Sequence, residues 1–143
     1  MTVLDANLLL YAYDSASAQH TAARAWIEQL FSGSEPVALP WPTICAFLRI
    51  MTNPRLPGER FTLGEATLVV ESWFAQPNIR ALGPGENHWQ ILSQLLVEGQ
   101  AAGPLISDAH LAAITIEHGG VLHTTDRDFS RFSGLRWKNP LQV

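Results

Sequence analysis

The chain contains very little cysteine or lysine: Cys45 and Lys138 are the single examples among its 143 residues. One cysteine cannot form an internal disulfide, so we expect Cys45 to be a small core residue in a protein of the reducing cytoplasm. No apolar run reaches the roughly 18 residues that a membrane span requires. Asp5 and Asp14 interrupt the amino-terminal apolar stretch, and no basic residue precedes it. A signal peptide is therefore a poor interpretation, and we expect no membrane association.

Positive charge is also scarce, because the formal net charge is −4. That balance argues against a protein that binds nucleic acid through bulk positive charge. Every basic residue except Lys138 is nevertheless an arginine, the residue type suited to bidentate phosphate contacts. The length and the 47% hydrophobic content are typical of one soluble domain, which we expect to span residues 1–143.

Short apolar segments alternate with longer amphipathic segments along the chain. The short segments have the length of buried strands, and the longer ones have the period of helices. We predict strands at 2–4, 36–39, 79–82 and 121–125, and helices from residue 6, at about 18–31, 42–52, 62–74 and 87–99, and from 107 or 108 to about 118. This alternation predicts an α/β fold, a three-layer α/β/α arrangement around a short central parallel sheet.

Local signals predict how several helices begin and which face they present. Thr62 and Glu65 have the spacing of a capping box, and Asn87 is placed to cap the next helix. One face of the helix at 18–31 is marked by Ala22, Ala25, Trp26, Gln29 and Leu30. Three tryptophans lie in amphipathic helices, where core or dimer packing is expected: Trp26, Trp73 and Trp89.

Four aspartates follow strands or begin helices. Asp5 follows the first strand directly, and Asp126 and Asp128 follow the strand at 121–125. Because ligands bind beyond the carboxyl ends of parallel strands, we expect these acids to meet at one edge of the sheet. Asp108 begins the helix that leads into the last of these strands, and a short connection would place it near the same edge.

Carboxylates held close together repel one another unless a cation lies among them. Oxygen ligands favour Mg²⁺, with Mn²⁺ as an alternative, over zinc. Each acid also has a simpler interpretation, because Asp5 and Asp108 could cap helices and Asp126 and Asp128 could be turn residues. Together at one predicted edge they favour a metal site. The histidines lack the spacing of zinc ligands, and we expect surface or packing roles for them: His110, His118 and His123.

Two other classes of protein also place acids at the edge of a parallel sheet. A phosphatase of the haloacid-dehalogenase type expects a second aspartate two residues after the first, where this chain has Asn7. A receiver-like phospho-acceptor module expects a lysine near its acids, and Lys138 lies far along the chain from Asp5. Both alternatives are therefore less favoured than a metal-dependent site.

The ordered motifs resemble the PIN-domain toxins of the VapC type over nearly the whole chain. Leu4 to Tyr11 is similar to the opening of that family, and Ser107 to Ala112 is similar to its later acidic helix start. Thr124 to Phe129 looks like its closing Thr-x-Asp-x-Asp-Phe turn. One branch of the family is resembled by Phe47–Arg49, Thr52–Arg55 and the tail from Gly134 to Leu141.

The resemblance implies a PIN-like fold, magnesium-dependent cleavage of RNA, a homodimer, and inhibition by a cognate antitoxin protein. Our hypothesis is that Asp5, Asp108 and Asp126 are catalytic and hold the metal, with Asp128 supporting the metal or its waters. Thr124 could orient a carboxylate or a water. Arg49 or Arg127 could contact a phosphate of the RNA substrate.

One departure from the family pattern concerns the helix after the second strand. The family often carries a glutamate there, whereas the segment Trp41–Phe47 contains no acid and Ala46 is the best matching position. A catalytically weakened PIN-fold module that still pairs with an antitoxin therefore stays an alternative to an active ribonuclease.

Overall fold

Five parallel strands form the centre of the structure, a computed structural model that describes residues 1–142. The strands are β1 (Thr2–Leu4), β2 (Val37–Pro40), β3 (Ile79–Leu82), β4 (Val121–His123) and β5 (Trp137–Lys138). Their order in the sheet is β3-β2-β1-β4-β5, and every pairing is parallel. The first strand of the sequence, β1, is therefore the central strand of the sheet and lies between β2 and β4, which places the first and last parts of the chain side by side.

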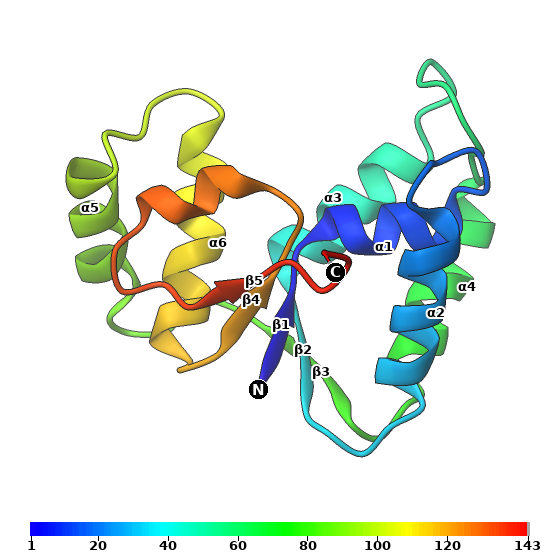
Figure 1. The fold of residues 1–143 in the computed structure, drawn as a ribbon, viewed down its shortest axis with the longest axis horizontal. Coiled ribbons are helices and arrows are strands. Elements are labelled where there is room, and N and C mark those ends of the chain that lie inside the picture. Colours follow the sequence, from blue (N-terminus) through cyan, green and yellow to red (C-terminus); the bar gives the residue numbers. More distant parts are fainter. Residues whose placement is uncertain (143) are drawn as a thin grey trace.

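Helices cover both faces of this sheet, as Figure 1 shows. Four helices lie on one side, α1 (Ala6–Tyr13), α2 (His20–Phe31), α3 (Trp41–Met51) and α4 (Leu63–Phe74). On the other side lie α5 (His88–Glu98), α6 (Leu105–Glu117) and the short 3-10 helix η1 (Arg127–Arg131). The predicted three-layer α/β/α architecture with a short parallel sheet is confirmed.

Alternate residues of the strands divide the core into two clusters. Leu4, Val37 and Leu39 pack in the cluster under α1–α4, whereas Val3 and Ala38 pack in the cluster under α5 and α6. Successive side chains of a strand point to opposite faces of the sheet, so adjacent positions must both be apolar in a sheet covered on both sides. The continuous apolar character of these short strands follows from this double burial.

Two predicted helix caps had different outcomes. The capping box of α4 is confirmed: Thr62 Oγ1 accepts from the Glu65 amide at 3.2 Å, and a Glu65 carboxylate oxygen accepts from the Thr62 amide at 2.9 Å. Asn87 occupies the cap position of α5, but its side chain forms no capping hydrogen bond. The carboxylate of Glu117 on α6 accepts instead from the amides of Gly85 (2.7 Å) and Asn87 (2.9 Å).

Several local predictions were wrong. The fully buried stripe of α2 is Ala23, Ile27 and Phe31. Of the predicted face, Trp26 and Leu30 pack, partly buried, against the core, whereas Ala22, Ala25 and Gln29 are exposed. Both stripes carry apolar residues, and packing against α1 selects the one that is buried. The predicted strand at 121–125 ends at His123, and β5 was missed because two residues are too few for a periodic signal.

The cysteine and the tryptophans differ in exposure. Cys45 is exposed on α3, so its assignment to the core was wrong. Trp73 is buried, Trp26 is partly buried and stacks on His123 with 5.5 Å between ring centroids, and Trp89 is exposed. Within residues 1–142, no helix combines the length and apolar character needed to cross a membrane.

Replacing Trp73 should strongly destabilise the fold. The side chain is 1% exposed, packs 4.7 Å from the ring of Phe47 between centroids, and donates from Nε1 to the Tyr13 hydroxyl at 2.9 Å. We expect Trp73→Ala to lower the free energy of unfolding by about 3–5 kcal/mol, measured by urea denaturation. The control Trp89→Ala, at a side chain 69% exposed, should change it by no more than about 0.5 kcal/mol. Equal losses for both variants would refute this assignment of the core.

Candidate active site

The pairing of β1 with β4 brings the residues that follow these two strands, which are far apart in the sequence, to one edge of the sheet. Leu4 lies opposite His123 in the register, and the amide of Asp5 donates to the carbonyl oxygen of His123 at 3.1 Å. Asp5 and Thr124 therefore leave neighbouring strands at the same level. Their sequence separation is no obstacle, because the carboxyl ends of parallel strands share one edge.

Asp5 both caps a helix and faces the other acids. Its Oδ1 accepts from the amide of Ala6 at 2.7 Å at the start of α1, and its Oδ2 accepts from the hydroxyl of Thr124 at 2.8 Å. Burial raises the pKa of Asp5 above its ordinary value, and the nearby charge of Asp126 acts in the same direction, while the two hydrogen bonds oppose them. The capping role and a role in a site are thus compatible.

Three further aspartates lie close together beside Asp5. Asp108, Asp126 and Asp128 each place one carboxylate oxygen within 4.8 Å of the others. Asp108 lies in the first turn of α6, and Asp126 caps η1 by accepting from the Asp128 amide at 2.9 Å. The connection from α6 through β4 to η1 therefore returns the chain to the point where α6 begins.

The electrostatic cost of this arrangement falls most clearly on Asp108. Burial and then the charges of Asp126, Asp5 and Asp128 raise the pKa of Asp108 to about 6, and Arg131 opposes them. A carboxylate surrounded by other carboxylates holds its proton more tightly, unless a cation compensates the charge. The donor set consists of carboxylate oxygens, which suits a hard divalent ion such as Mg²⁺ or Mn²⁺. Helix α3, which contains Ala46, adds no acid to this set.

The other predicted site residues have different surroundings. Thr124 is fully buried, donates to Asp5, and accepts from the amide of Asp126 at 3.0 Å. Arg49 on α3 and Arg127 at the start of η1 are both exposed and form no ion pair with the described residues. They are therefore free to contact a ligand in solution.

Sequence reasoning missed two residues at this edge. Arg131 on η1 donates to the carbonyl oxygen of Gly99 at 2.9 Å and lowers the pKa of Asp108. Asn7 on α1 donates to the hydroxyl oxygens of Thr124 (3.2 Å) and Thr125 (2.9 Å). The only signal for Asn7 was its position two residues after Asp5, which sequence reasoning used only to disfavour a phosphatase.

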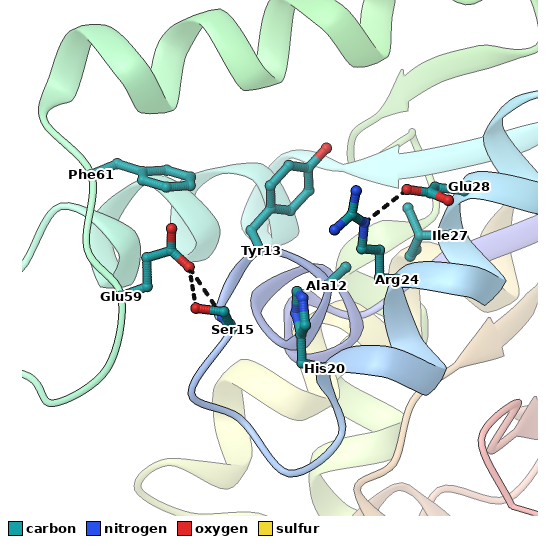
Figure 2. A pocket seen from close by; sticks show the side chains of 9 residues that line it. All are labelled: Ala12, Tyr13, Ser15, His20, Arg24, Ile27, Glu28, Glu59 and Phe61. Carbon is teal, nitrogen blue, oxygen red and sulfur yellow. Dashed lines mark hydrogen bonds and ion pairs between the residues drawn. The ribbon is translucent and has the colours of Figure 1, made fainter.

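A cavity of about 420 Å³ lies away from the acids, between the end of α1, α2 and the segment before α4 (Figure 2). Tyr13, His20 and Phe61 line it, together with the ion pair of Arg24 and Glu28, whose atoms are 2.9 Å apart. Neither Asp5 nor any of the three clustered aspartates lines this cavity. The candidate active site is therefore identified by its cluster of carboxylates and not by this cavity.

Removing the charge of Asp108 should stabilise the metal-free protein at neutral pH. The folded pKa is about 6 against an ordinary 3.8, so between these values the folded chain binds more protons than the unfolded chain, and stability falls as pH rises. Melting in a chelator should give Asp108→Asn a higher Tm than wild type at about pH 7, and the difference should vanish near pH 4. A lower or unchanged Tm at about pH 7 would contradict the crowding of these carboxylates.

Comparison with known proteins shows which family the chain belongs to. The sequence model of the PIN domain matches residues 2–135. The ribonuclease VapC33 of Mycobacterium tuberculosis (strain ATCC 25618 / H37Rv) is 37% identical over 142 residues, which cover 99% of this chain and 99% of the relative.

Solved structures share the fold at lower sequence identity. VapBC2 from Rickettsia felis, bound to a DNA fragment from the promoter, has a chain that superposes with a TM-score of 0.72 at 13% identity, covering 96% of this chain and 97% of that one. The Mycobacterium tuberculosis toxin VapC20, described as cleaving the sarcin-ricin loop, gives a TM-score of 0.68 at 14% identity, with 95% and 99% covered. The chain belongs to the PIN domain family, in the branch that contains the VapC ribonucleases.

Proposed function

We propose that this chain is a magnesium-dependent endoribonuclease and the toxin of a type II toxin-antitoxin system. The observation that supports the proposal best is the meeting of Asp108, Asp126 and Asp128 within 4.8 Å beside Asp5. Relatives that match nearly the whole chain are named VapC ribonucleases, which supports RNA as the substrate. Manganese is the alternative ion for the same oxygen ligands.

Each acid has a distinct part in the proposed mechanism. Asp108, Asp126 and Asp5, which is held by the hydroxyl of Thr124, would hold the ion, and Asp128 would support the metal or its waters. A bound divalent ion supplies charge stabilisation at a phosphate and lowers the pKa of a coordinated water. Exposed Arg127 would hold the RNA phosphates near these acids, with Arg49 as a second contact.

The proposed partners are an antitoxin, RNA and a second copy of this chain. A toxin-antitoxin complex from Klebsiella pneumoniae contains a chain of the same fold, with a TM-score of 0.66 at 14% identity, which supports a protein antitoxin here. A short reading frame beside the gene, encoding a DNA-binding segment, would add independent support for the pairing.

RNA cleavage should require both the divalent ion and the acids. Purified protein should cut RNA with Mg²⁺ and lose the activity in chelator, and Asp5→Asn or Asp108→Asn should lower the rate by about 100-fold or more. Glu71→Gln, at an exposed carboxylate of α4, is the matched control and should leave the rate unchanged. The proposal is wrong if chelator and both aspartate variants leave cleavage intact.

A second candidate function is a catalytically weakened module that binds an antitoxin without cutting RNA. The absence of an acid from α3, where Ala46 stands, favours this alternative. Calorimetry separates the two: an active site should bind Mg²⁺, and Asp108→Asn should abolish the binding while Glu71→Gln preserves it. A weakened module should give no Mg²⁺ binding that depends on Asp108.

A further inference from the structure

The side chain of Asn7 lies at the centre of the hydrogen bonds that join α1 to the segment after β4. Its Nδ2 donates to Thr124 Oγ1 at 3.2 Å and to Thr125 Oγ1 at 2.9 Å. Thr124 Oγ1 is also 3.0 Å from the amide of Asp126 and 2.8 Å from Asp5 Oδ2. The hydroxyl of Thr124 thus contacts two N–H donors, the side-chain amide of Asn7 and the backbone amide of Asp126, and one carboxylate.

The inventory of donors and acceptors fixes where the proton of Thr124 points. A threonine hydroxyl has one hydrogen and two lone pairs. The Asp126 amide can only donate, and it uses one lone pair of the Thr124 oxygen. The Asn7 amide donates to the other lone pair, so the single hydroxyl hydrogen must be directed to Asp5. If the Asn7 amide were turned over, its oxygen would compete for that hydrogen, and the ionised carboxylate of Asp5 would face a lone pair at 2.8 Å.

The orientation of the Asn7 amide satisfies the hydrogen bonds of the two threonines and leaves the carbonyl oxygen of Asn7 without a partner among the described residues. Asn7 Oδ1 is buried and has no hydrogen-bond partner among the described residues. Both amide hydrogens, in contrast, are directed to threonine oxygens. The two threonines therefore determine the amide orientation, and the cost is one unsatisfied carbonyl oxygen.

We propose that Asn7 is a positioning residue that fixes the hydroxyl proton of Thr124 on Asp5 Oδ2 and so orients this carboxylate toward the ion. The inference rests on the proposed function, because it assigns a role in metal binding. Mutation of the hydrogen-bond partner of a metal ligand typically weakens metal binding by about 10-fold to 100-fold. An aspartate at position 7 could not serve, because its carboxylate offers only acceptors to the two threonines.

The decisive variant is Asn7→Asp, which keeps the shape of the side chain and replaces the donors by acceptors. We expect the Mg²⁺ dissociation constant, measured by calorimetry, to rise roughly tenfold even though the site gains a negative charge. Added charge alone would lower that constant, so tighter binding by Asn7→Asp overturns the proposal. Asn87→Asp, at an exposed asparagine, is the matched control and should change nothing.

A double-mutant cycle tests whether Asn7 acts through Thr124. Asn7→Leu should weaken Mg²⁺ binding roughly tenfold in the wild-type and Thr124→Ser backgrounds, which keep the hydroxyl, and less than about twofold in Thr124→Val. Equal effects in all three backgrounds overturn the proposal. If Thr124→Val does not fold in circular dichroism melts, the Asn7→Asp result decides alone. Asp108→Asn in the same series distinguishes failure of the Asn7 proposal from failure of the proposed function. If Asp108→Asn abolishes Mg²⁺ binding while the Asn7 variants bind normally, only the role of Asn7 is wrong. If the wild-type protein binds no Mg²⁺, the proposed function is wrong as well.

Discussion

Repulsion among carboxylates at the carboxyl edge of the sheet is the constraint on which the site depends. Strand order places Asp5 beside the segment that carries Asp126, and the return of the chain from α6 adds Asp108. The fold maintains this crowding through the buried core on both faces of the sheet and through hydrogen bonds that hold Asp5 and Asp126. A folded chain that keeps unpaired acids together gains most from a ligand that cancels their charge.

The fold was predictable from the sequence because its signals are local. Buried strands, helix periods and the capping box of Thr62 and Glu65 are properties of short segments, and together they predicted the layers and most element bounds. The errors arose where tertiary packing decides between similar local patterns. Two apolar stripes compete on α2, and the buried one contains Ile27; Cys45 is equally compatible with either face of α3 until its neighbours are known.

The site was predictable only in part. Asp5 and Asp126 follow strands, so the rule for parallel sheets was enough to place them at one edge. Asp108 needed an assumption about how α6 connects to β4, and the positions of its neighbours determine the rise in its pKa. Asn7 could not be assigned from sequence, because its role lies in the direction of one hydroxyl hydrogen on a residue 117 positions away. Arg131 was missed because a single arginine carries no motif.

The most direct test of the central claim is diffraction from crystals grown with Mn²⁺, with data collected at the manganese absorption edge. The account predicts an anomalous peak among the carboxylate oxygens of Asp108, Asp126 and Asp128, on the side that faces Asp5. A map with no peak there, or with manganese bound only at other surface acids, would contradict it.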